Sequence, residues 1–411
     1  MQRLAPLAAA GFAAVLLGGT AVAGTITVNA DTSDPAPRAA WEAAIAKFQE
    51  KNPDIEVKFN VYDHESYKKS IRNWLTSASP DVVFWYVGNR MEQFVEPGLL
   101  EDVSAVYTDD VKGDMTEAAL DLVTVDGKQY GVPYTYYQWG IYFRDDLLQA
   151  AGIEQAPQTF DELIAACDAL NESGVAPIAI GSKDLWPTAG WFDYLNLRLN
   201  GLEFHKELMG GAVPYTDERV RAVFAKWQEL LDHNCFVENH ASVSWQESQA
   251  LLYQGKAAMM LIGNFIAPNF PDNIRDQMQF TPFPTINPDV GLYEDAPMDS
   301  LHIPAKAQNK EDAMKFLAFA MQPEVQESIN VALVQLPVNQ KAELADDRFL
   351  RDGAELLGQT DGLAQFYDRD TDEALATSAM KGFQEFMIKP DRLDRILEDI
   401  DRARQRAYRR S

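Results

Sequence analysis

Segments typical of strands alternate with segments typical of helices in the early part of the chain. "GTITVNA" (24–30) and "IEVKFNV" (55–61) alternate apolar and polar side chains, and "PDVVFWYVGN" (80–89) is almost continuously apolar. Between the first two segments, Trp41, Ile45 and Phe48 recur at the spacing of one helix face. This alternation predicts an α/β fold in which right-handed crossovers build a parallel sheet covered by helices.

The ends of these strands are where functional side chains are expected. Ligands bind outside the carboxyl ends of the strands in open α/β sheets. The three strands are followed by loops at 31–34, 62–65 and 85–90. These loops supply the first candidate ligand-binding residues, which are Asp31, Trp85, Asn89 and Arg90.

The first 23 residues are predicted to be a secretory signal. Arg3 precedes an apolar run, and small residues follow that end in Ala21-Val22-Ala23. We therefore expect cleavage before Gly24 and a soluble, exported protein that resides in the periplasm. Such a protein lies in an oxidising compartment, so Cys167 and Cys235 could pair, although burial as two free thiols is the alternative.

The 388 residues that follow the signal exceed the size of a single hydrophobic core, which is about 250 to 300 residues. At least two lobes are therefore expected. No segment rich in Pro, Gly or Ser marks a linker, which suggests that the chain crosses between the lobes more than once.

The charge of the chain excludes some partners. Without Arg3, 35 Lys and Arg residues remain against 62 Asp and Glu, a net charge of −27. Such a surface repels nucleic acids and anionic lipid headgroups. No pair of Cys or His residues has the spacing of metal ligands, so neither a metal nor a cofactor is expected.

A second α/β unit is predicted after residue 158. The helix "TFDELIAACDAL" begins with a capping box of Thr159 and Glu162, and the strand "APIAI" follows it. The next segment, "GSKDLWPTAGWFDY", is expected to be an exit loop. Further helices are predicted at 217–233 and 247–253, with a strand "AAMMLIG" that ends at Asn264-Phe265. The last helix is expected to bury Leu393, Ile396, Leu397 and Ile400.

Seven aromatic rings lie within the fourteen positions from Tyr130 to Phe143. By the period of two, Tyr137, Trp139, Ile141 and Phe143 share one face, which favours packing. Tyr134, Tyr136 and Gln138 carry polar groups that could reach a ligand.

Motifs of several enzyme classes are absent: the sequence has no G-x-S-x-G, H-E-x-x-H, Walker A or G-x-G-x-x-G segment. A secreted carbohydrate-active enzyme stays open as the alternative, because the carboxylates of a glycosidase are paired in space and not in sequence. The run from Asp368 to Asp372 imitates the start of a calcium loop, but Glu373 replaces the turn glycine and Ala379 replaces the bidentate Glu.

Eight segments occur in the order found in one known family. They are "FQEKNPDIEVKF", "SASPDVVFWYVGN", "GLLEDVS", "DGKQYGVPYTYYQWGIYFRDDLLQAAGI", "APQTFDEL", "LLYQGKAAMMLIGNF", "TPFP" and "IPAKAQNKEDAMKFLAFAMQPEVQESI". The order and spacing of these segments resemble those of the periplasmic sugar-binding proteins of ABC transporters, the extracellular solute-binding family 1 that includes maltose-binding protein.

The resemblance implies two α/β lobes joined by several crossings, with a mono- or disaccharide in the cleft and delivery to a membrane permease. It places crossings near Pro133 to Tyr137, near Pro284 and near Leu336 to Val338. The implied division is a signal at 1–23, an N-terminal lobe of 24–133 plus 284–337, and a C-terminal lobe of 134–283 plus 338–411. A monomer is expected.

Aromatic platforms and polar side chains are what a sugar site needs, because sugars present C–H faces and hydroxyl groups. Trp186 and Trp245 are platform candidates, whereas Trp191 has core-like neighbours. Phe265 stands where many relatives have Trp, so an indole donor is missing there. The complete set of predicted ligand-binding residues is Asp31, Trp85, Asn89, Arg90, Tyr137, Gln138, Trp186, Trp245, Asn264, Phe265, Asp299, Asp368 and Arg369. Arg90 and Arg369 keep an anionic sugar open as the ligand, although a solvated charge cluster is the alternative for Asp368 and Arg369.

Overall fold

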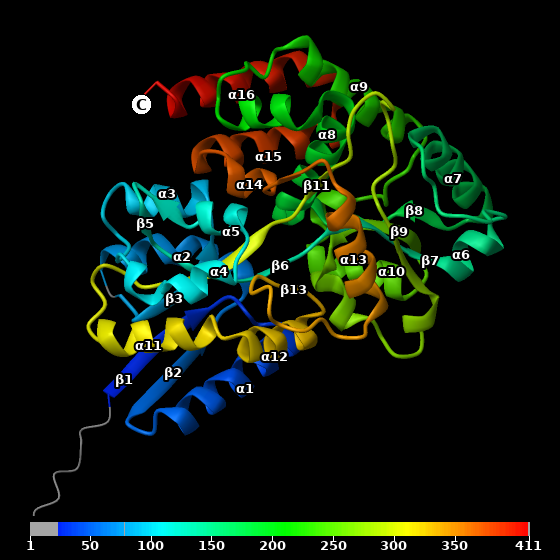
Figure 1. Ribbon diagram of the computed structural model, residues 1–411. Coiled ribbons are helices and arrows are strands. Elements are labelled where there is room, and N and C mark those ends of the chain that lie inside the picture. Colours follow the sequence, from blue (N-terminus) through cyan, green and yellow to red (C-terminus); the bar gives the residue numbers. More distant parts are fainter. Residues whose placement is uncertain (1–23, 78, 410–411) are drawn as a thin grey trace, which may run out of the picture.

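The computed structural model describes residues 24–77 and 79–409. The predicted signal lies outside the described residues. The chain forms two α/β lobes, each with its own sheet and hydrophobic core (Figure 1). In the part of the chain that the structure describes, none of the helices combines the length and the apolar character needed to cross a bilayer.

The sheet of the first lobe has the spatial order β13-β6-β12-β3-β1-β2. Its strands are β1 (Gly24–Ala30), β2 (Ile55–Val61), β3 (Val82–Tyr86), β6 (Val132–Tyr136), β12 (Met298–His302) and β13 (Leu336–Pro337). The first three strands are parallel, as predicted. The whole sheet is mixed, however, because β12 runs antiparallel to both β3 and β6. Local patterns near the N-terminus could not predict a strand that arrives so late in the chain.

The helices of the first lobe cover its sheet and bury the predicted faces. They are α1 (Pro35–Lys51), α2 (His64–Thr76), α3 (Asn89–Val95), α4 (Asp109–Gly113), α5 (Glu117–Asp121), α11 (Lys310–Ala320) and α12 (Pro323–Leu333). A short hairpin joins β4 (Thr124–Val125) to β5 (Lys128–Gln129). Trp41 and Phe48 are fully buried on α1, as their spacing predicts. On α2, Tyr67, Ile71 and Leu75 are buried, and Trp74 is half-buried.

The second lobe is built around the sheet β10-β7-β9-β8. Its strands are β7 (Trp139–Arg144), β8 (Ala176–Ile178), β9 (Ala257–Gly263) and β10 (Met278–Thr281). Its helices are α6 (Asp145–Ala150), α7 (Phe160–Ser173), α8 (Trp186–Met209), α9 (Glu218–Asp232), α10 (Trp245–Tyr253), α13 (Arg348–Gln359), α14 (Tyr367–Asp370), α15 (Glu373–Ile388) and α16 (Leu393–Ala407). On α16, Ile396, Leu397 and Ile400 are buried, whereas Leu393 is partly buried.

Helix starts in the second lobe follow capping chemistry. The predicted capping box of Thr159 and Glu162 is present at α7, and a second box of Ser244 and Glu247 makes α10 begin two residues earlier than predicted. The predicted exit loop at 181–194 is wrong, because α8 already begins at Trp186. Pro187 occupies one of its first two positions, where proline favours helix initiation because its fixed φ suits a helix and its missing N–H is not needed.

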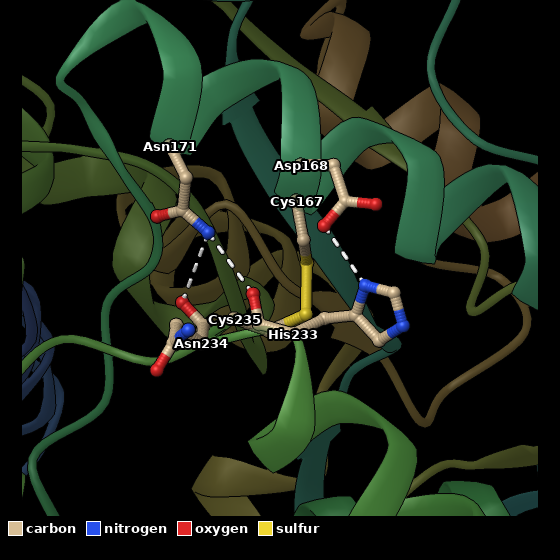
Figure 2. Close-up of a disulfide and its surroundings, with 6 residues drawn as sticks. All are labelled: Cys167, Asp168, Asn171, His233, Asn234 and Cys235. Atoms are coloured by element: carbon tan, nitrogen blue, oxygen red, sulfur yellow. Dashed lines mark hydrogen bonds and ion pairs between the residues drawn. A yellow bond between two sulfur atoms is a disulfide. The ribbon is translucent and has the colours of Figure 1, made fainter.

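The two cysteines form a disulfide within the second lobe (Figure 2). It joins Cys167 on α7 to Cys235 just beyond α9, with Cα atoms 5.2 Å apart. Both side chains are fully buried. The pairing decides between the two alternatives that the sequence left open.

The chain passes between the lobes at several points. It crosses first between β6 and β7, because these strands belong to different sheets. Strand β11 (Tyr293–Asp295) pairs with β14 (Gly362–Ala364), beside α8 of the second lobe, and β12 then enters the sheet of the first lobe. The second passage therefore lies between Asp295 and Met298. After β13 the chain returns to the second lobe and forms α13 to α16.

Candidate ligand-binding cleft

A cavity of about 160 Å³ lies between the lobes and is lined by residues of both. The loop after β1, the first turns of α2, the end of β3 and part of β12 supply one wall. The N-terminal ends of α8 and α10, the start of β7 and helix α14 supply the other. Helix α14 contacts α3 of the first lobe and α8 of the second. The site therefore uses strand ends and helix N-termini, the parts of α/β units where ligands bind.

The wall of the first lobe is mainly polar. Asp31 directly follows β1, and its Oδ2 lies 3.0 Å from Nδ1 of His64 at the start of α2. The other ring nitrogen of His64 lies 3.5 Å from the hydroxyl of Tyr86, at the end of β3. Burial alone would raise the pKa of Asp31, but the hydrogen bond and the charge of His64 outweigh burial and lower it. Asp31 is thus held as a carboxylate that faces the cavity.

Arg369 on α14 reaches across the cleft to the first lobe. Its guanidinium donates to Asp299 on β12 at 2.8 Å and to the hydroxyl of Tyr137 at 3.0 Å. It also lies over the ring of Tyr86, 3.9 Å from the centroid. Burial raises the pKa of Asp299 even though Arg369 opposes that rise. The positive charge of Arg369 is therefore already engaged by protein groups.

A second ion pair joins the lobes next to it. Lys68, one turn into α2, donates to Asp368 of α14 at 3.0 Å, and both side chains are largely buried. Burial would raise the pKa of Asp368, but Lys68 and the nearby Arg90 and Arg369 lower it to about 2. The pair therefore links α2 of the first lobe to α14 of the second, and both side chains line the cavity.

The wall of the second lobe is mainly aromatic. Its rings are those of Tyr137, Trp139, Trp186, Trp245, Phe265 and Phe366. Trp139 stacks on Phe366 with centroids 4.5 Å apart, and Trp186 lies 5.7 Å from Trp245. Trp186 and Trp245 are 7% and 6% exposed, so each ring belongs to the core and also faces the cavity.

Eight of the thirteen predicted ligand-binding residues line the cavity. They are Asp31, Tyr137, Trp186, Trp245, Phe265, Asp299, Asp368 and Arg369. Trp139, which the strand period assigned to packing, lines it as well. The assignment of these side chains to ligand binding is still a prediction.

The other five predicted residues do not line the cavity, and protein groups satisfy several of them. The indole of Trp85 donates to the backbone carbonyl of Arg90 at 3.1 Å. The side chain of Asn89 accepts from Gln93. Gln138 donates to the carbonyl of Phe349 at 2.9 Å, and Asn264 accepts from Tyr142 at 2.6 Å. The guanidinium of Arg90 lies over the ring of Trp85.

Several lining residues were not among the predicted ones. Asp34, His64 and Tyr86 fall within the loops that the strand ends had indicated, so the positions of these loops could have identified them. Lys68 lies on a helix, and the sequence gives no sign that its long side chain reaches the other lobe. Among the described residues, no group of three or more His, Cys, Asp or Glu side chains could hold a metal ion.

The fold and cleft define a class of two-lobed periplasmic binding proteins, and comparison with known proteins gives the family. A model for bacterial extracellular solute-binding proteins matches residues 32–327, which is more than half of the chain. The chain therefore belongs to this family and is a solute-binding component of an ABC transporter. The family and the similar structures are binding proteins of transporters and not enzymes.

Individual relatives support this assignment. The chain is 25% identical to an uncharacterized ABC transporter extracellular-binding protein of Pyrococcus horikoshii, over 74% of this chain and 69% of that protein. It is 26% identical to an osmoprotective compounds-binding protein of Synechocystis sp., over 78% of each chain. The structure matches the bacterial solute receptor AcbH, described as having an exclusive preference for β-D-galactopyranose, with a TM-score of 0.88 and 28% identity. That match covers 92% of this chain and 98% of AcbH.

Proposed function

We propose that this protein binds a mono- or disaccharide in the interlobe cleft and delivers it to the membrane permease of an ABC importer. The observation that carries the proposal is the pairing of an aromatic wall with a polar wall across one cavity. Aromatic faces pack against the C–H face of a sugar ring, and carboxylates accept hydrogen bonds from its hydroxyl groups.

The size of the cavity favours a monosaccharide. A water takes up about 30 Å³ in the liquid, so a cavity of about 160 Å³ has room for roughly five waters. That room suits one sugar ring better than two linked rings. The preference described for AcbH makes β-D-galactopyranose the first sugar to test.

Three buried indole donors support a ligand with hydroxyl groups. The Nε1 atoms of Trp139, Trp186 and Trp245 have no hydrogen-bond partner within the described part of the chain. A buried donor without a partner costs about 1 to 3 kcal/mol. Because all three side chains line the cavity, small adjustments of the rings on binding would let sugar oxygens accept from them.

The protein is further proposed to act in the periplasm as a monomer, after cleavage before Gly24. The apolar leader and the extracellular family support export. Intact mass of the exported protein checks the cleavage site, and light scattering checks the oligomeric state. A retained leader would contradict a free periplasmic protein.

Sugar binding is proposed to close the two lobes, with the crossings near Pro133, between Asp295 and Met298, and near Leu336 acting as hinges. The predicted moving units are 24–133 plus 284–337 and 134–283 plus 338–411. The observed packing differs from this division just before Met298, because β11 pairs with β14 and lies beside α8 of the second lobe. Small-angle scattering should show a smaller radius of gyration with saturating sugar. An unchanged radius despite measured binding would contradict closure.

The central test is a thermal-shift screen with hexoses, pentoses, disaccharides and polyols, followed by calorimetry on the hits. A ligand of the folded state raises the melting temperature by mass action. We expect at least one neutral sugar to do so and to be recovered chemically unchanged. If a neutral sugar is hydrolysed, the carbohydrate-active enzyme is favoured, and if none binds to folded protein, the proposed function fails.

A further inference from the structure

Asp34 occupies the N-cap position of α1 but does not cap the helix. At an N-cap, an Asp carboxylate normally accepts from the backbone N–H of the second or third helical residue. Pro37 occupies the third position of α1 and has no N–H, and the side chain of Asp34 makes no capping hydrogen bond. By contrast, Asp63 at the N-cap of α2 accepts from the N–H of Ser66 at 2.9 Å.

The carboxylate of Asp34 lines the cleft instead. Among the residues that the structure describes, Asp34 has no hydrogen-bond or ion-pair partner for its side chain. Burial raises the pKa of Asp34, and the nearby Asp31 adds to the rise while His64 opposes it. A half-buried carboxylate without a partner is incompletely compensated, so a hydrogen-bond donor placed beside it would be favourable.

The other three carboxylates of the cleft are already paired. Asp31 lies against His64, Asp299 against Arg369, and Asp368 against Lys68, each at 3.0 Å or less. These pairs use both cationic side chains that line the cavity, Lys68 and Arg369. Among the described residues that line the cavity, Asp34 is therefore the carboxylate that has no cationic partner.

This balance of charge argues against the anionic sugar that Arg90 and Arg369 had kept open. Arg90 does not line the cavity, and Arg369 donates to Asp299 and Tyr137. A ligand carboxylate or phosphate would have to displace one of these partners inside a cavity that Asp34 also lines. A hydroxyl or ammonium group would instead donate to Asp34 without breaking any pair.

We propose, building on the proposed sugar-binding function, that Asp34 is a specificity-determining residue of the cleft. Its carboxylate accepts a hydrogen bond from a hydroxyl or ammonium group of the ligand. The cleft therefore takes neutral and amino sugars and rejects sugar acids and sugar phosphates.

Calorimetry with two matched series tests the proposal: D-galactose and D-glucose, their 2-amino derivatives and their uronic acids. The wild-type protein is expected to bind a neutral or amino sugar at least tenfold more tightly than the matching uronate. Asp34→Asn should weaken the neutral and amino sugars by about tenfold or more, because a charge-assisted hydrogen bond is lost. The same change should also reduce the ratio of the affinity for these sugars to the affinity for the matching uronate.

Asp63→Asn is the matched control. Asp63 caps a neighbouring helix without lining the cavity, and Asn is an equally good N-cap, so this variant should bind all six sugars as the wild type does. Equal affinity of the wild type for a uronate and its neutral sugar would overturn the inference. So would an Asp34→Asn variant with an unchanged affinity ratio. If folded protein binds neither series nor any other neutral sugar or polyol, the proposed function fails and this inference fails with it.

Discussion

Removing the disulfide should cost the protein a measurable part of its stability without changing its affinity for ligand. Cys167 and Cys235 are 68 positions apart, so their bond closes a long loop in the unfolded chain. The chain-entropy relation for a loop of this length gives about 4.4 kcal/mol at 25 °C. The unfolding entropy of a chain of 388 residues is about 0.8 kcal/mol/K, so the melting temperature should fall by about 5 °C.

The assay is differential scanning calorimetry of the Cys167→Ala/Cys235→Ala variant beside the wild type with and without reductant. Reduced wild type should resemble the variant, and the variant should not respond to reductant. Both cysteines lie outside the cleft lining, so the affinity for any sugar that binds should stay the same.

A local control separates chain entropy from damage to the packing around the bond. Asp168, next to Cys167, pairs with His233 at 2.8 Å, and both side chains are about half exposed (Figure 2). Asp168→Asn should therefore change stability by less than about 1 kcal/mol. If the double variant and the reduced wild type both melt within about 1 °C of the oxidised protein, the reasoning from loop length is refuted.

Three further predictions concern the cleft and the buried histidines. Trp186→Ala or Trp245→Ala should weaken sugar binding by more than tenfold and lower the stability of the unliganded protein by about 3 kcal/mol or more, because each ring is both core and wall; normal binding by both variants would contradict this assignment. Burial lowers the pKa of His205 and of His302 to about 4, so the unfolded chain takes up their protons first as the pH falls below about 6.5. Each histidine should then reduce the free energy of unfolding by up to about 3 kcal/mol as the pH falls from 6.5 to 4. NMR signals of these two imidazoles that titrate near pH 6.5 would contradict the prediction. Because the pKa of Asp368 is lowered to about 2, Asp368→Asn should lower the free energy of unfolding by about 2 kcal/mol above pH 4. Chemical denaturation should show this difference between variant and wild type decrease as the pH falls towards 2.

The parts of the fold that depend on local pattern could be predicted from the sequence. The parallel strands β1 to β3, the buried face of α1 and the capping box of α7 each follow from residues close together in the chain. The insertion of β12 between β3 and β6 could not be predicted in this way, since pairing between distant segments leaves no local period.

The cleft was predictable to a similar extent. Strand ends indicated the loops that supply Asp31 and Tyr86, but not which side chain of each loop turns to the cavity. Gln138 and Asn264 follow the right strands and still turn into the core, where the amide of Gln138 donates to the carbonyl of Phe349 and the amide oxygen of Asn264 accepts from Tyr142. The ion pairs that span the two lobes depend on tertiary geometry alone.

The place of β12 in the first sheet has a consequence for how the chain acquires its structure. Strands β1 to β3 are complete by Tyr86, yet the neighbour of β3 is supplied by Met298–His302, about 200 residues later. During synthesis, the apolar edge of β3 stays unpaired until most of the chain has been made. Contacts so distant in sequence slow folding, and an open strand edge invites association with other chains. A sheet completed this late makes the folding of the first lobe depend on a contact between two distant segments of the chain.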